Sequence, residues 1–165
     1  MKLVIGGEFL ISTRSIIRDF LLLTRAAVTT TAPPKPGAVI APRIDGEPVW
    51  VLVAGMGDLN KFTDALATAS SYLGAGLASA GCGLVTCGWP GVDETVARAF
   101  ADGLIDQDAE LEHRLIQVME GQMTPVFAAG QLVFCKPDDA WSESLHRADV
   151  AILLGGVGGT QETGE

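Results

Sequence analysis

Basic residues are scarce in this sequence. Its 165 residues include 20 Asp and Glu but only 11 Lys and Arg, which gives a formal net charge of -9 at pH 7. A surface of that sign repels a phosphate backbone unless a local basic patch overrides it. We therefore expect no nucleic acid partner. A small anionic ligand must be held by backbone N–H groups and helix N-termini, which work whatever the overall charge.

Cysteine and histidine are also scarce. The three cysteines lie in or beside apolar, strand-like runs, without CxxC spacing or the paired His that a zinc site needs. We expect free, buried thiols in a reducing compartment, no metal site and no required cofactor. Neither His113 nor His146 lies beside a GxSxG nucleophile, and each is expected to be a solvated helix residue.

Long apolar runs are absent, because none reaches the roughly 18 residues that a membrane helix needs. Charges interrupt the apolar stretch at residues 3–28, which also lacks the order of a signal peptide. We therefore predict a cytoplasmic protein with no membrane partner. Threonines and prolines at 29–36 have the composition of a linker. Residues 1–45 are accordingly an N-terminal extension and linker, and residues 46–165 one domain.

From residue 46 onward, short apolar runs alternate with segments of helical periodicity. The spacing predicts an α/β fold of the Rossmann-like kind, with a parallel sheet between two helical layers in a three-layer αβα arrangement. In such sheets ligands bind at the carboxyl ends of the strands. The predicted strands are 49–54, 84–87, 132–135 and 149–154, and the predicted helices are 61–80, 92–103, 108–121 and 140–147.

Glycine-rich turns follow three of the predicted strands, at 55–58 (GMGD), 88–91 (GWPG) and 155–160 (GGVGGT). Such a turn lets the backbone approach a phosphate and aligns N–H groups toward it. Glycine also closes strained turns without any ligand, but three turns at one edge favour a shared nucleotide-type ligand. The first turn lacks the third glycine of the dinucleotide fingerprint, and no GKS or GKT follows any turn as in a P-loop.

The candidate ligand-binding residues lie in these turns and the helices behind them. Trp89 either stacks on a base or covers the core, whereas Asp58 and Asp93 contact ribose or cap a helix. Glu162 contacts ribose, acts as a general base or is only a helix dipole partner, and Glu165 is an equally placed rival. The full set is Gly55, Gly57, Asp58, Gly88, Trp89, Gly91, Asp93, Gly155, Gly156, Gly158, Gly159, Thr160 and Glu162.

The segment 148–162 (ADVAILLGGVGGTQE) resembles the last strand and PGGxGTxxE loop of the SLOG superfamily. Residues 52–58 fall where its first loop lies, and 84–97 (LVTCGWPGVDETVA) resembles its YGGGxxGLMGxVA segment. The superfamily includes the LOG phosphoribohydrolases, often labelled lysine decarboxylases, the DNA-processing protein DprA, and sensor domains beside TIR or sirtuin-like modules. The resemblance covers about residues 48–165, and it implies a homodimer and a final helix and strand after Glu165, where the sequence is expected to be truncated.

Departures from the LOG pattern separate the possible functions. Leu154 replaces the loop proline, and the Arg-Lys pair of LOG enzymes corresponds to Ala140 and Trp141, while Glu162 corresponds to the catalytic glutamate. The resemblance is therefore closer to the sensing branch, which binds a nucleotide-derived signal such as an ADP-ribose derivative and regulates an effector in cis or in trans. Two alternatives stay open: LOG-type hydrolysis of nucleoside 5'-monophosphates by Glu162, and a structural role in assembly.

Overall fold

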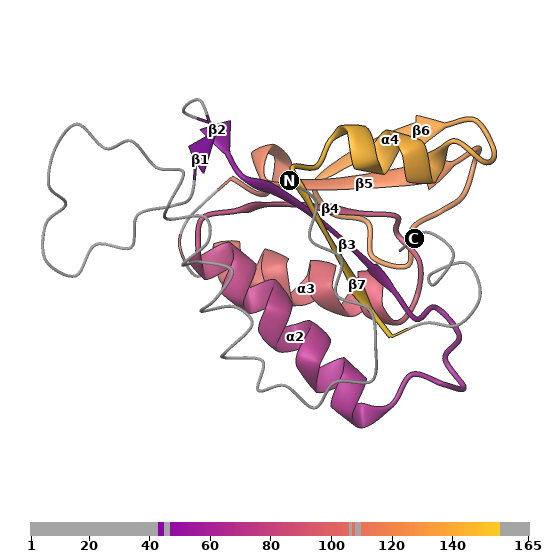
Figure 1. Cartoon of the computed structure of the whole chain (residues 1–165), viewed down its shortest axis with the longest axis horizontal. Coiled ribbons are helices and arrows are strands. Elements are labelled where there is room, and N and C mark those ends of the chain that lie inside the picture. Colours follow the sequence, from indigo (N-terminus) through magenta and orange to yellow (C-terminus); the bar gives the residue numbers. More distant parts are fainter. Residues whose placement is uncertain (1–42, 45–46, 106, 108–109, 156–165) are drawn as a thin grey trace, which may run out of the picture.

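A computed structural model describes residues 43–44, 47–105, 107 and 110–155 of the protein. Five strands form one parallel sheet in the order β6-β5-β4-β3-β7 (Figure 1). This arrangement confirms the predicted α/β, Rossmann-like class. The strands of the sheet are β3 (Trp50–Gly55), β4 (Gly83–Thr86), β5 (Leu115–Glu120), β6 (Gln131–Cys135) and β7 (Val150–Leu154).

Helices cover both faces of the sheet. The long helices α2 (Asp64–Ser79) and α3 (Val92–Ile105) lie on one face, and α4 (Ala140–His146) lies on the other beside β5 and β6 (Figure 1). Because side chains alternate along a strand, Val51 and Val53 of β3 pack in the core beneath α2 and α3, whereas Leu52 packs in the core beneath α4. The three layers follow from this alternation of buried residues.

The two long helices contact each other closely at a glycine. A Cβ atom on Gly74 of α2 would collide with the carbonyl oxygen of Val96 and lie 3.0 Å from the backbone nitrogen of Phe100 in α3. The buried face of α2 therefore runs through Gly74, Leu73 and Leu77, whereas Ala65 in its first turn is exposed.

The prediction of a helix at 108–121 was wrong. Apart from the short 3₁₀ turn η1 (Leu111–His113), the described part of this segment is strand β5, which lies between β4 and β6. Spacings of four and three between Leu111, Leu115 and Val118 imitate a helical face. Most of β5 is buried because both neighbouring strands and helices on both faces cover it.

No helix occurs in the connection between β5 and β6, residues 121–130. The buried Gln117 of β5 fixes this connection, because its side-chain amide donates hydrogen bonds to the carbonyl oxygens of Phe127 (2.7 Å) and Ala129 (2.8 Å). Phe127 packs against the core on the α2/α3 face, and the guanidinium of Arg98 lies 4.6 Å from its ring centre. This segment thus covers the part of the sheet that a crossover helix normally covers.

The predicted boundary at residue 45 falls between the two strands of a small hairpin, in which β1 (Arg43–Ile44) pairs antiparallel with β2 (Glu47–Pro48). All three cysteines are free, and Cys82 and Cys87 are buried as predicted, while Cys135 on the edge strand is half-buried. Within the described ranges, no helix has the length and apolarity to span a membrane.

Candidate functional site

The order of the strands reverses next to β3. The chain proceeds from β3 through β4 and β5 to β6 in one direction, and then returns to place β7 on the other side of β3. The carboxyl ends of β3 and β7, at Gly55 and Leu154, are paired in register. Open α/β sheets generally bind their ligands at the carboxyl edge beside such a reversal.

Backbone hydrogen bonds from Met56 lock this edge together. The Met56 N–H donates to the carbonyl oxygen of Leu154 at the end of β7 (3.1 Å), and the Met56 carbonyl accepts from the N–H of Val92 at the start of α3 (3.1 Å). Met56 was not among the predicted site residues. It acts through its backbone, so its side-chain type gives no signal in the sequence.

Gly55 and Gly91 have a packing role in this edge. A Cβ atom on Gly55 would collide with the carbonyl oxygen of Leu154 and lie 2.9 Å from both methyl groups of Val92. A Cβ atom on Gly91 would collide with the Met56 carbonyl oxygen, and the φ of Gly91 is +81°. Turn-to-turn contact therefore accounts for both glycines without a ligand.

The other described glycines differ in what surrounds them. Gly57 is half-buried, and a Cβ atom there would meet only the carbonyl oxygen of Pro90 at 3.7 Å. Gly88 has a φ of +71° and lies beside Met119, and the exposed Gly155 has a φ of +62°. Gly57 is thus the glycine of the first two turns whose missing side chain is not explained by packing.

The remaining polar and aromatic candidates of the first two turns face solvent. Asp58 is exposed, and its carboxylate accepts a hydrogen bond from the Asn60 N–H (3.0 Å) and pairs with Lys61 at 3.5 Å. The Asn60 backbone hydrogen bond is the main reason why the pKa of Asp58 is lowered. Trp89 is 44% exposed, and its carbonyl oxygen accepts a hydrogen bond from the Glu94 N–H in α3. Its ring is therefore available for stacking.

Asp93, by contrast, is an acid inside the protein. Only 2% of its surface is exposed, and its Oδ2 accepts a hydrogen bond from the Cys87 N–H at 2.9 Å. Burial raises the pKa of Asp93 to about 7, and hydrogen bonds from the backbone N–H groups of Cys87, Gly55 and Trp89 oppose that rise. The spacing of α3 contained this signal, because Asp93 lies on the same helical stripe as the buried Ala97, Ala101 and Leu104.

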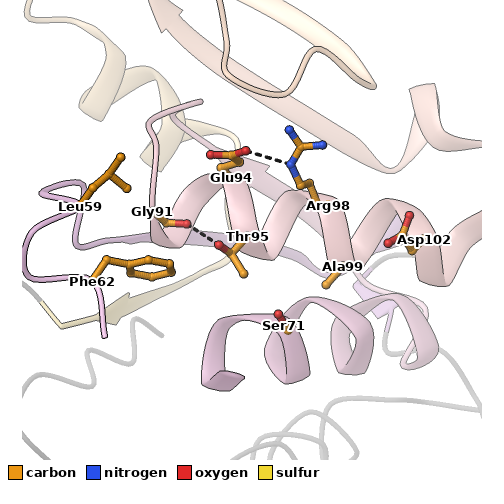
Figure 2. A pocket seen from close by; sticks show the side chains of 9 residues that line it. All are labelled: Leu59, Phe62, Ser71, Gly91, Glu94, Thr95, Arg98, Ala99 and Asp102. Carbon is orange, nitrogen blue, oxygen red and sulfur yellow. Dashed lines mark hydrogen bonds and ion pairs between the residues drawn. The ribbon is translucent and has the colours of Figure 1, made fainter. Parts of the chain in front are cut away.

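A hollow of about 420 Å³ lies on the outer side of α3 (Figure 2). Phe62 from the loop after β3 and Ser71 from α2 line it together with α3. Among its lining residues the one cation is Arg98, which hydrogen-bonds Glu94 at 2.9 Å and lies over Phe127. Of the predicted site residues only Gly91 borders this hollow, so the hollow was not anticipated from the sequence.

The other candidates belong to the loop after β7. They lie outside the described residues, so their contacts with a ligand stay predictions. They are Gly156, Gly158, Gly159, Thr160 and Glu162. The described part of this edge thus provides the paired ends of β3 and β7, the first two glycine turns and the N-terminus of α3.

Comparisons with known proteins show the fold alone. No family model and no curated protein matches the chain. The X-ray structure of TM1055 shares the fold with a TM-score of 0.59 and 23% identity, over 70% of this chain and 67% of that one. The molybdenum cofactor carrier protein of Chlamydomonas reinhardtii has a TM-score of 0.58 and 18% identity, over 69% of this chain and 66% of its own. The similarity thus spans about two thirds of each neighbour.

Proposed function

We propose that this domain binds a nucleotide-derived ligand of the ADP-ribose type at the carboxyl edge of the sheet, for sensing or regulation. The observation that carries the proposal is the reversal of strand order between β3 and β7, where Gly57 and Gly155 follow two strands paired in register. Backbone N–H groups in glycine turns favour an anionic ligand despite a net charge of -9. The name of one structural neighbour, a molybdenum cofactor carrier, supports small-molecule binding by this fold.

Two features favour binding over LOG-type hydrolysis. By the resemblance, Ala140 and Trp141 occupy the positions of the Arg-Lys pair, and they contribute to the core beneath α4. The nearby Arg147 pairs with Glu143 at 2.5 Å. A hydrolase of this chain would therefore need another cation to orient Glu162 and hold the substrate phosphate.

The proposal is tested by calorimetric titration of the full chain with ADP-ribose, cyclic ADP-ribose isomers and AMP, followed by chromatography for released base. Gly57→Leu is the informative variant, because a Cβ atom there meets only the carbonyl oxygen of Pro90, at the ordinary contact distance of 3.7 Å, in a turn where the ligand is proposed to bind. Ser79→Leu, at the end of α2, is the matched control.

Saturable binding that Gly57→Leu abolishes and Ser79→Leu preserves supports the proposal. Release of adenine from AMP, lost in Glu162→Gln, would replace it with the hydrolase. If the chain binds none of these compounds, the binding function and the hydrolase are both excluded, and the structural role in assembly is left.

A further inference from the structure

Asp93 is the one acidic or basic side chain in the buried core of the described residues. Asp93 follows directly on Val92, the first residue of α3, and the N–H groups of its neighbours Val92 and Glu94 already donate to the carbonyl oxygens of Met56 and Trp89. A buried carboxylate is unfavourable unless hydrogen bonds compensate for its lost hydration. The compensating groups are backbone N–H groups of the two turns that meet there.

Those N–H groups come from two different strands. The Cys87 N–H, after β4, donates to Oδ2 of Asp93 at 2.9 Å. The N–H groups of Trp89 in the same turn and Gly55 at the end of β3 also stabilise the carboxylate. Convergent N–H groups in glycine turns beside a helix N-terminus are the groups that normally bind phosphate. In this protein a carboxylate of its own chain faces them.

We propose that Asp93 is an internal anion, a positioning residue that holds the turns after β3 and β4 against α3 and occupies the N–H groups that a bound phosphate would otherwise use. The inference rests on the proposed function and deepens it. The phosphates of the ligand then lie toward Gly57 and Gly155, rather than over the N-terminus of α3. The turn after β4 contributes Trp89 and its shape, but not its anion-binding groups.

The charge of Asp93 then also sets how the site responds to pH. Because burial raises its pKa to about 7, Asp93 gains its charge as the pH rises through neutrality and repels a nearby anionic ligand more strongly. The titratable group facing it is the Cys87 thiol, whose pKa burial and then Asp93 raise to about 12, so this thiol stays neutral. The Ser144 hydroxyl of α4 lies 3.4 Å from the Cys87 sulfur. Glu94, the next residue of α3, forms an ion pair with Arg98.

The first test needs no ligand. Amide NMR spectra at about pH 8 are compared for the wild type, Asp93→Asn and the control Asp102→Asn, which removes the same charge from an exposed position on α3. The Cys87 and Trp89 N–H resonances should move in Asp93→Asn and stay in place in Asp102→Asn. Equal shifts in the two variants would overturn the proposal. If Asp93→Asn does not fold, a wild-type titration decides, since both resonances must move together with a midpoint near 7.

The second test measures binding of ADP-ribose at about pH 6 and pH 8, because its pyrophosphate keeps a constant charge over that range. Wild-type affinity should fall at the higher pH, whereas Asp93→Asn should bind equally at both and roughly tenfold more tightly than the wild type at pH 8. Equal affinities in wild type and variant at both values would contradict the proposal. If neither the wild type nor Asp93→Asn binds ADP-ribose at either pH, the proposed function is refuted. The amide spectra would still decide the role of Asp93.

Discussion

Residues of one type have different uses at the carboxyl edge. Gly91 lies against the Met56 carbonyl with a φ of +81°, whereas Gly57 has space where its side chain would be. In the sequence both residues belong to glycine-rich turns, so their different roles cannot be distinguished there. Their different surroundings make them a matched pair for distinguishing packing from ligand contact.

Gly91→Ala should lower the free energy of unfolding by about 2 kcal/mol or more, because a left-handed backbone conformation and a backbone collision both oppose the new methyl group. Gly57→Ala should change it by less than about 0.5 kcal/mol. Urea denaturation of both variants measures this difference. Equal losses in the two variants would show that Gly57 is also required for packing.

Asp93 should make the protein less stable as the pH rises from about 4 to 7. The pKa of an unfolded Asp is about 3.9, and burial raises the folded value to about 7. Between these values the folded state retains a proton that the unfolded state loses, so the free energy of unfolding falls by up to about 1.4 kcal/mol per pH unit.

Above about pH 7 this contribution is constant, because Asp93 is ionised in both states. The difference in unfolding free energy between wild type and Asp93→Asn, measured across this range, isolates the contribution from that of other groups. A difference that does not vary with pH would mean that Asp93 titrates normally.

The packing of two elements depends on single contacts, one between the backbones of two helices and one made by a polar side chain. Helices α2 and α3 approach at Gly74, and the connection from β5 to β6 is held by the side-chain amide of Gln117. Both contacts lie inside the α2/α3 face of the molecule. Each contact can be tested by one substitution, with a control substitution on the same or the neighbouring element.

Gly74→Ala should destabilise the protein by about 1–3 kcal/mol. Alanine normally improves a helix by about 1 kcal/mol over glycine, but at this position the methyl group collides with the backbone of Val96, which cannot give way. Gly76→Ala, at a half-exposed position of the same helix, provides the control and should be neutral or stabilising. Thermal unfolding of both variants tests the prediction, and a stabilised Gly74→Ala would show that the helices are further apart.

Gln117→Leu should cost about 1–3 kcal/mol, because the carbonyl oxygens of Phe127 and Ala129 lose their donor inside the protein. It should also speed proteolytic cleavage within 121–130. Gln107→Leu, which removes one exposed hydrogen bond to the Gly103 carbonyl, should have little effect. Unchanged cleavage in Gln117→Leu would mean that other contacts hold the connection.

Sequence periodicity predicted the elements whose burial follows a simple rule. The runs around Val51, Val85 and Ile152 are buried on both faces and were predicted as strands, and α3 was predicted from Val92, Val96 and Phe100. Strand β5 was missed because its apolar residues also fit a helical spacing. The position of β7 beside β3 depends on long-range packing, which local spacing does not contain.

At the scale of the whole molecule, the site arises from the topology. The turns that the sequence singled out meet because the strand order reverses at β3, and Met56 joins the end of β7 to the start of α3. The sequence did not show which glycines serve packing or that Asp93 faces inward. Both features depend on contacts between segments far apart in the chain. The chain shares this architecture with a molybdenum cofactor carrier protein at 18% identity. This similarity extends to the fold alone.

We propose that a nucleotide-derived ligand binds at the carboxyl ends of β3 and β7. This binding is tested most directly by amide chemical-shift mapping of the full chain during titration with ADP-ribose. Binding at this edge should give saturable shifts at Met56, Gly57 and Gly155, with smaller shifts around Phe62 and Arg98 in the hollow beside α3. Shifts confined to that hollow, or no saturable shift at all, would contradict the claim.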